Sequence, residues 1–256
     1  MHAADDAAVV LALEEQMAAT WVPLERQWLG RWLLRAGRGW TGRANSVLPL
    51  GDPGCALDEA IAAVVSWYGA RDLRPMVAVP LPVLDDLAAA LRERGWQRQW
   101  GALVMTVAVD DILARLPQRM DLPPVTVATE PDDAWLAAYH YRGGPLPPHA
   151  VAILRAGDPR FASVREDGAV LAIGRFVVHD GMVGITAMEV AESQRRRGLG
   201  AHLLRGAIAA GSAAGARLAW LQVDHSNDPA QALYTAAGFT RHHSYDYYAP
   251  AGRSPS

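Results

Sequence analysis

Residues 188 to 200 read Met-Glu-Val-Ala-Glu-Ser-Gln-Arg-Arg-Arg-Gly-Leu-Gly, and the mostly apolar run 201–214 follows them directly. The residues Met182 to Val190 are mostly apolar and predict a strand. Gly198 and Gly200 therefore stand where a strand gives way to a helix. Without a β-carbon they let backbone N–H groups close on an anion, and the first turn of a helix adds unpaired donors and a partial positive charge. With three arginines at 195–197, the stretch predicts a phosphate-binding loop.

Two common glycine loops do not fit this stretch. A P-loop requires Gly, four residues, Gly, then Lys and Ser or Thr, whereas Leu199 and Gly200 follow Gly198 here. The dinucleotide fingerprint G-x-G-x-x-G requires a third glycine, where this chain has Leu203. The P-loop is excluded and the dinucleotide fingerprint is disfavoured.

The pattern Arg195-x-x-Gly198-x-Gly200 after a strand resembles the pyrophosphate loop of the GNAT superfamily of acyl-CoA-dependent N-acyltransferases. Further along the chain, residues 227–239 read Asn-Asp-Pro-Ala-Gln-Ala-Leu-Tyr-Thr-Ala-Ala-Gly-Phe. This stretch is similar to the GNAT pattern N-x-x-A-x-x-L-Y-x-x-x-G-F. The two patterns occur in the order and at the distance expected for the superfamily. The resemblance implies an α/β fold and an N-acetyltransferase that uses acetyl-CoA as acyl donor and needs no metal.

The same resemblance implies which residues form the site. The backbone N–H of Val190 would polarise the acyl carbonyl, the acceptor amine would attack directly, and Tyr234 would hydrogen-bond the leaving sulfur. Residues implied in binding the cofactor are Met188, Val190, Arg195, Arg196, Arg197, Gly198, Leu199, Gly200, Ala201, Asn227, Ala230 and Tyr234.

The chemistry of Tyr234 suits a hydrogen-bond donor better than a full acid. A phenol of pKa about 10 is a weaker acid than a thiol of about 8.5, so complete proton donation to the thiolate is uphill by roughly 2 kcal/mol. The alternative is a core tyrosine whose hydroxyl is satisfied by the protein.

The general base is left open among Glu189, His225 and water. Glu189 adjoins the position that would polarise the carbonyl and could take a proton directly or through water, or it could be paired with the arginines. Keeping an amine of pKa about 10.4 neutral at pH 7 costs about 4.6 kcal/mol, against about 1 kcal/mol for an α-amino group near 7.8. Glu189 therefore matters more for a lysine-like acceptor. The pair His242–His243 is a weaker candidate.

Composition narrows the class of protein. The chain has 256 residues, 51% of them hydrophobic and 20% charged, which is typical of a globular protein with a sizeable core. A net charge of −3 gives no electrostatic signature of nucleic-acid binding, so a nucleic-acid binder that uses the arginine triplet is the disfavoured alternative. The single cysteine, Cys55, forms neither an internal disulfide nor a metal-ligand pattern.

Location follows from what the sequence contains. The first residues lack a signal-peptide pattern and no apolar run reaches 18 residues, so we expect a cytoplasmic protein without a membrane partner. All 24 basic residues are arginine, which suggests a GC-rich bacterial genome. Expected partners are acetyl-CoA and a small-molecule or peptide amine, with a homodimer left open. A CoA-binding regulatory pseudoenzyme without turnover is the alternative function.

The order strand, helix, strand, helix, strand occurs in both halves of the chain and predicts two GNAT-like units, each a mixed, mostly antiparallel sheet flanked by helices. We expect a degenerate unit at 1–116 that supports structure or shapes the substrate site, a linker at 117–124, and the catalytic unit at 125–256. Where the second unit has its glycine loop, the first has Gly51-Asp52-Pro53-Gly54. An acidic side chain and a proline there predict no cofactor site.

The predicted elements take their bounds from periodicity and turn residues. Asp167-Gly168 and Asp180-Gly181 are hairpin signals, and 143–148 is a loop near the expected acceptor entry. In the helix after the glycine loop, Leu203 and Ala207 face the sheet while His202 and Arg205 lie opposite. Asp228 is expected to cap the last helix, which Gly238 ends. Helices are predicted at 5–19, 57–70, 84–94 and 131–141, and strands at 28–35, 44–50, 74–79, 100–109, 125–128, 161–166, 170–179 and 217–224.

Overall fold

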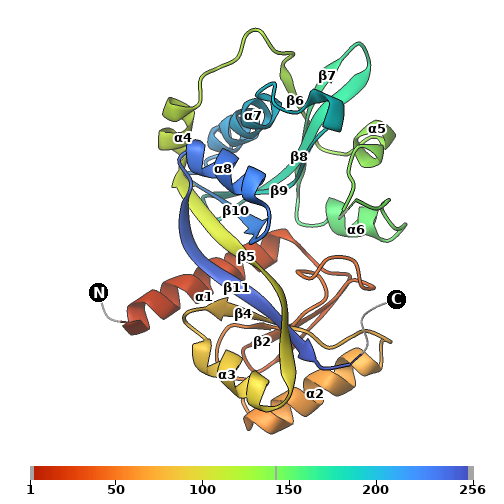
Figure 1. Ribbon diagram of the computed structural model, residues 1–256, viewed down its shortest axis with the longest axis vertical. Coiled ribbons are helices and arrows are strands. Elements are labelled where there is room, and N and C mark those ends of the chain that lie inside the picture. The colour runs from red at the N-terminus through yellow and green to blue at the C-terminus, as the bar shows by residue number, and fades with distance from the viewer. Residues whose placement is uncertain (1–2, 142, 253–256) are drawn as a thin grey trace. The chain divides into compact units, whose positions relative to one another are not determined.

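The computed structural model describes residues 3–141 and 143–252, which fold into two compact units. Unit 1 comprises the described residues up to Leu103 together with those from His242 onward, and unit 2 comprises Val104–Arg241. The predicted α/β fold of mixed, mostly antiparallel sheets flanked by helices is confirmed (Figure 1). The expected linker at 117–124 lies within unit 2, and the last strand groups with unit 1. The functional division at 1–116 and 125–256 stays a prediction.

Unit 1 contains a three-stranded sheet of order β1-β2-β3 and a second sheet portion of order β4-β11-β5. The strand β11 groups with unit 1 because Ser244 to Tyr248 pair antiparallel with β4. The elements of unit 1 are α1 (Ala3–Thr20), β1 (Glu25–Leu29), β2 (Trp32–Ala36), β3 (Leu48–Pro49), α2 (Leu57–Gly69), β4 (Val77–Leu81), α3 (Asp85–Glu93), the first part of β5 (Trp96–Ala108) and most of β11 (Thr240–Pro250).

Two predicted strands of unit 1 are wrong. The expected strand 28–35 is a hairpin of β1 and β2, because Gly30 has a φ of 53° in the turn and a β-carbon there would lie 2.2 Å from the carbonyl carbon of Pro53. The expected strand 44–50 shrinks to β3. Asn45 organises the preceding loop: its side-chain oxygen accepts from the N–H groups of Gly37 and Gly39, both at 2.8 Å.

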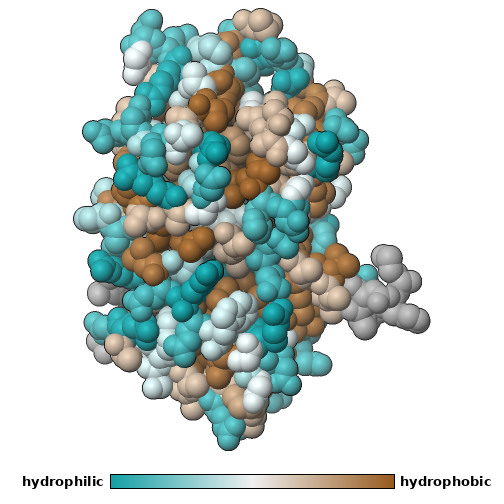
Figure 2. All heavy atoms as spheres, turned by 180° about the vertical axis from the view of Figure 1, so that it is seen from behind, coloured by the Kyte–Doolittle hydropathy of each residue, from teal (hydrophilic) through white to brown (hydrophobic). Residues whose placement is uncertain are grey.

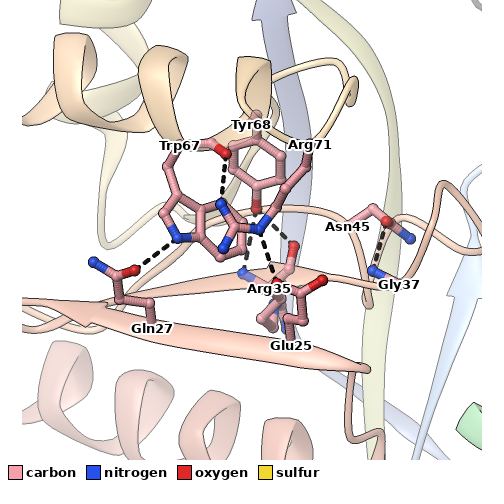
Figure 3. Close-up of polar contacts among 8 residues, drawn as sticks. All are labelled: Glu25, Gln27, Arg35, Gly37, Asn45, Trp67, Tyr68 and Arg71. Carbon is pink, nitrogen blue, oxygen red and sulfur yellow. Dashed lines mark hydrogen bonds and ion pairs between the residues drawn. The ribbon is translucent and has the colours of Figure 1, made fainter.

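Helix α2 is joined to the first sheet of unit 1 by polar contacts as well as by its apolar face (Figure 3). The buried hydroxyl of Tyr68 donates to the carbonyl of Arg35 at 2.8 Å and accepts from the N–H of the same residue at 3.3 Å. Arg71 stacks over the ring of Trp67, with its Cζ 3.8 Å from the ring centroid, and donates to Glu25 at 3.1 Å. Burial together with hydrogen bonding therefore fixes this helix in place.

Unit 2 contains a sheet portion of order β5-β10-β9-β8-β7-β6, in which β9 and β10 are parallel and β6 to β9 are antiparallel. Both predicted hairpin turns are present, with positive φ at Asp167, Gly168, Asp180 and Gly181. The elements are the end of β5, α4 (Val109–Arg115), β6 (Val125–Ala128), α5 (Asp133–Ala137), α6 (Ala150–Arg155), β7 (Arg160–Glu166), β8 (Ala169–His179), β9 (Met182–Val190), the 3-10 turn η1 (Glu192–Gln194), α7 (Leu199–Ala213), β10 (Leu218–Asp224) and α8 (Asp228–Ala236).

The predicted helix 131–141 is much shorter than expected. Asp132 caps α5 by accepting from the N–H of Trp135 at 2.8 Å, so the helix starts after Pro131 rather than on it. At the other end, the N–H of His140 donates to the carboxylate of Glu189 at 2.7 Å instead of to a helical carbonyl. A contact with a distant strand therefore replaces the last turn of the predicted helix.

Helix α7 lies against β8 and β9, as predicted, with Leu203, Leu204 and Ile208 buried (Figure 1). Its glycines allow a close approach: a β-carbon on Gly211 would lie 2.8 Å from Val183. The placement of His202 on the exposed face is wrong. Its side chain is buried, and Nε2 lies 2.9 Å from the carbonyl oxygen of Pro123, because the segment expected to be a linker packs along this helix.

The helices and one face of the molecule can be examined for apolar character. Within residues 3–141 and 143–252, no helix combines the length and the apolar character needed to cross a bilayer. Figure 2 shows one face of the molecule, on which hydrophobic residues gather in separate patches between hydrophilic ones.

Candidate functional site

Strand β9 carries a β-bulge two residues before the strand ends. Ile173 of β8 pairs with Glu189, whereas Arg175 pairs with Thr186, so two residues of β9 stand opposite Gly174. Ala187, the first of the two, has a φ of +49°, which only a firmly held backbone sustains in a residue other than glycine. Of the predicted site residues, Met188 is the second residue of the bulge, and Glu189 and Val190 follow it at the end of the strand.

Beyond the bulge, β9 presents a backbone donor. The register of β9 with β10 runs from Met182 to Ile185. The N–H of Ala191 donates to Leu171 of β8 at 2.9 Å. Because hydrogen-bonded and non-hydrogen-bonded pairs alternate in antiparallel strands, the N–H of Val190 points away from β8, toward the side on which the β10 register has already ended. This geometry suits a donor to a ligand carbonyl.

The glycine loop leads directly into α7. Arg196 and Gly198 have φ values of +63° and +81°, and the helix begins at Leu199. The N–H groups of the first helical turn therefore point out of the loop without helical acceptors. Arg195, Arg196 and Arg197 are exposed around them, while the side chain of Leu199 is buried in the core. The loop can therefore offer an anion backbone donors, the positive end of a helix and formal charge.

Gly200 joins the start of α7 to the other elements of the site. A β-carbon there would lie 3.2 Å from Leu233 of α8 and 3.7 Å from Val190 of β9. The predicted loop, the end of β9 and helix α8 therefore lie side by side in unit 2.

Tyr234 turns its hydroxyl toward Met188. The hydroxyl lies 3.9 Å from the thioether sulfur, and the ring packs edge-on against Phe239 with the centroids 5.9 Å apart. Burial raises the pKa of Tyr234 to about 12. The phenol therefore stays protonated at neutral pH, and the thioether that it faces is a weak acceptor.

Asn227 caps α8, where the sequence predicted Asp228. Its side-chain oxygen accepts from the N–H of Ala230 at 3.1 Å, and Asp228 and Pro229 occupy the first turn. The oxygen of Asn227 and the N–H of Ala230 thus satisfy each other. Gly238 ends the helix with a φ of +99°, as predicted.

The predicted candidate base Glu189 lines a cavity of about 490 Å³, which we call the Glu189 cavity. Its carboxylate accepts from the N–H of His140 at 2.7 Å and lies 2.9 Å from Nδ1 of the same residue. The side chain of Glu189 is 24% exposed and that of His140 is 51% exposed. The cavity is lined by Ala138, His140, Gly143, Val170, Leu171, Ala172, Ile173, Glu189, Ala191, Glu192 and Arg195.

His140 is the functional candidate that the sequence reasoning missed. It lies 49 residues before Glu189 and inside a predicted helix, so no local pattern singled it out. The signal that could have found it is weak: a histidine just before the loop expected at the acceptor entry.

The other histidine candidates are held by main-chain or buried contacts. The carbonyl of His225 accepts from Gln231 at 2.9 Å at the end of β10. In unit 1, Nε2 of His243 lies 2.9 Å from the buried carboxylate of Glu14, and its Nδ1 lies 2.9 Å from Nδ1 of His242. Burial and the neighbouring imidazole lower the pKa of His242. In the described residues, no group of three or more His, Cys, Asp or Glu side chains is placed to hold a metal ion.

Comparisons with known proteins identify relatives of the chain. Residues 7–248 match the family described as "Probable histone acetyltransferase Rv0428c C-terminal". The chain is 34% identical over 249 residues to the protein of that name from Mycobacterium tuberculosis, covering 94% of this chain and 74% of the relative. It is 26% identical over 238 residues to an uncharacterized N-acetyltransferase, YobR, from Bacillus subtilis, covering 89% and 93% of the two chains.

Solved structures share the fold. A GCN5-related N-acetyltransferase from Kribbella flavida superposes with a TM-score of 0.72 at 19% identity, covering 96% of each chain. A tandem GNAT protein from the clavulanic acid biosynthesis pathway superposes with a TM-score of 0.60 at 18% identity, covering 88% of this chain and 79% of the other.

Proposed function

The chain belongs to the Rv0428c C-terminal family of GNAT acetyltransferases, and on this premise we propose that it transfers the acetyl group of acetyl-CoA to a primary amine by direct attack. The observation that carries the proposal is the meeting in unit 2 of the glycine loop, the bulged end of β9 and Tyr234 through Gly200 and Met188. Each of these three parts has a separate task in such a reaction.

The first task is to hold the acyl donor. The N–H groups from Arg196 to Ala201 are proposed to bind the pyrophosphate, aided by the exposed arginines at 195–197. The N–H of Val190 would donate a hydrogen bond to the carbonyl oxygen of the thioester and stabilise the negative charge that develops there. Met188, Asn227 and Ala230 would line the adjoining pantetheine path, with Asn227 acting through the helix end that it caps.

The second task is to stabilise the leaving group. As the amine nitrogen bonds to the carbonyl carbon and the carbon–sulfur bond breaks, the sulfur becomes a thiolate. Tyr234, whose hydroxyl faces the sulfur of Met188 in this structure, would donate its hydrogen bond to that thiolate instead. With a pKa of about 12 against about 8.5 for a thiol, complete proton transfer is uphill by about 5 kcal/mol. Tyr234 is therefore a donor, and the thiolate takes its proton from water.

The third task is to accept the proton of the amine in the Glu189 cavity. Among the described residues, the carboxylates of Glu189 and Glu192 and the guanidinium of Arg195 line this cavity. Carboxylates favour a basic amine over an anionic acceptor. The relative from Mycobacterium tuberculosis is named a histone acetyltransferase, and we include lysine side chains among the acceptors to be tested.

The first half of the chain is proposed to bind no second cofactor. In unit 1 the side chain of Asp52 already accepts from the N–H of Gly54 at 2.7 Å. A carboxylate thus occupies the donor that an anion would need, and Pro53 supplies none. We propose that one chain binds one CoA and that residues 1–116 serve a structural or substrate-shaping role.

Release of free thiol from acetyl-CoA tests the proposed function. The full chain would be mixed with lysine peptides, polyamines and α-amino acids, and the thiol titrated with a disulfide reagent while calorimetry measures acetyl-CoA binding. We expect one bound acetyl-CoA per chain and amine-dependent thiol release. Binding without release for any amine would favour the regulatory protein, and absence of binding would refute the assignment of the site.

A further inference from the structure

We infer that His140 is the base that accepts the proton of the acceptor amine, and that Glu189 is a positioning residue which holds the imidazole ring for this role. The inference rests on the proposed function, because it concerns the same reaction. It assigns the proton to a residue that neither the GNAT-like sequence pattern nor the comparisons indicate.

The contact geometry determines which nitrogen is available. One residue engages both oxygens of the carboxylate: the N–H of His140 donates to Oε2 at 2.7 Å, and Nδ1 lies 2.9 Å from Oε1. An ionised carboxylate can only accept hydrogen bonds, so Nδ1 must carry the hydrogen. In the neutral ring the lone pair is then on Nε2. This is the arrangement by which a carboxylate holds an imidazole in the tautomer of a general base.

Exposure separates the roles of the two side chains. The carboxylate of Glu189 has both oxygens occupied and is 24% exposed, whereas the side chain of His140 is 51% exposed and lines the same cavity of about 490 Å³. The ring is therefore the part of the pair that an acceptor can reach. In general an imidazole is also a stronger base than a carboxylate by about two pKa units. Both differences favour His140 as the proton acceptor.

The anchor of the pair is the bulged end of β9. Glu189 immediately follows the bulge and precedes Val190, whose N–H is proposed to polarise the thioester carbonyl. The short helix α5 ends at Ala137, three residues before His140, whose N–H donates to Glu189. The two contacts on one residue fix both the backbone and the ring, which reduces the freedom that a base on a loop would otherwise have.

The proton balance is complete without a further reactant. The neutral amine forms the new carbon–nitrogen bond as the carbon–sulfur bond breaks, and its extra proton passes to Nε2 of His140. The resulting imidazolium keeps its Nδ1–H on Glu189, whose negative charge stabilises it. The thiolate leaves with a hydrogen bond from Tyr234, and His140 returns its proton to water.

The activity test compares His140→Ala and His140→Gln with Glu189→Gln in the full chain, using the amine of highest turnover from the panel. His179→Gln, a change of an exposed histidine at the end of β8, is the matched control. We expect both His140 variants to lose at least 100-fold in kcat with unchanged acetyl-CoA affinity, since a general base contributes about 100- to 10,000-fold. Added imidazole should restore part of the activity of His140→Ala, and Glu189→Gln should lose about tenfold.

Two results would overturn the inference. A folded His140→Ala variant that retains activity within threefold of wild type excludes the base role. A loss in Glu189→Gln larger than that in His140→Ala, without rescue by imidazole, would return the base role to Glu189.

Nitrogen NMR of the wild-type protein tests the positioning role without turnover. The ¹⁵N shifts of His140 should show hydrogen on Nδ1 and a free Nε2 at pH 8, and Glu189→Ala should abolish this preference. A ring with hydrogen on Nε2 in wild type refutes the inference. If wild type releases no thiol with any amine, the proposed function fails and the base role fails with it, whereas the NMR result still decides whether Glu189 positions the ring.

Discussion

Within residues 3–141 and 143–252, each unit contains a carboxylate–imidazole pair, and the two pairs have the same length. Glu14 and His243 of unit 1 lie 2.9 Å apart with side chains 6% and 0% exposed, whereas Glu189 and His140 of unit 2 lie 2.9 Å apart with side chains 24% and 51% exposed. Both nitrogens of His243 have protein partners, the second being His242. The ring of His140 instead borders a cavity. The same two functional groups therefore stabilise a fold where they are enclosed and are available for chemistry where one of them is open.

The largest effect that would test this comparison is on stability. His243→Ala should lower the free energy of unfolding by about 3–5 kcal/mol, because it leaves the buried carboxylate of Glu14 without a partner. His140→Ala should cost less than about 1 kcal/mol, because that pair is partly exposed. Thermal or urea unfolding of the full chain measures both. Equal losses would mean that burial does not distinguish the two pairs.

Two tyrosines sharpen the comparison through activity: Tyr234 of unit 2, which is partly buried, and Tyr68 of unit 1, which is buried. Tyr234→Phe removes a hydroxyl needed when the thiolate forms, so kcat should fall roughly 10- to 100-fold, the equivalent of one hydrogen bond to a charged group, with acetyl-CoA affinity unchanged. Tyr68→Phe in unit 1 leaves the backbone groups of Arg35 unpaired and should lower stability instead. Steady-state kinetics and thermal unfolding of both variants separate the two roles. A Tyr234→Phe variant that is unstable yet fully active would show that Tyr234 serves the core and not the reaction.

Glycines at corresponding places in the two units offer a third contrast. Gly198→Val strains a backbone with a φ of +81°, and Gly200→Val pushes against Leu233. Each variant should bind acetyl-CoA at least tenfold more weakly, a loss of about 1.4 kcal/mol in binding free energy, because it disturbs the proposed phosphate donors. Gly54 of unit 1 also lies in a glycine-containing loop and has a φ of +78°. The variant Gly54→Val is therefore the control for backbone strain without loss of the proposed phosphate donors. Calorimetry in which all three variants bind as wild type would sink the loop assignment.

The smallest expected effect is the pH dependence of stability contributed by His242. Because the pKa of His242 is lowered in the folded chain, the unfolded state binds its proton more readily. The contribution is present above the unfolded pKa of about 6.5 and is lost as pH falls below it. Melting temperatures between pH 7.5 and 5.5 should therefore fall slightly more for wild type than for His242→Gln. Parallel curves for the two proteins would contradict this sign.

The sequence by itself determined the parts of the molecule that depend on neighbouring residues. The glycine loop, the strand 182–190, both hairpin turns and the helix end at Gly238 occur where the sequence predicts them. Each is a matter of side-chain periodicity over a few residues or of which residues tolerate positive φ. The resemblance to GNAT enzymes rests on the same local patterns, and the family match confirms it.

Only the tertiary structure decided the features that need distant partners. His140 and Glu189 lie 49 positions apart in the sequence, and their contact replaces the last turn of the helix that was predicted at 131–141. The bulge at Ala187 depends on the register with β8, and the burial of His202 depends on the segment that packs along α7. Such contacts form because burial and long-range hydrogen bonding outweigh local preference, which amounts to only a few tenths of a kcal/mol per residue. For this reason the glycine loop between β9 and α7 could be predicted from the sequence, whereas the proposed base became visible only in the folded chain.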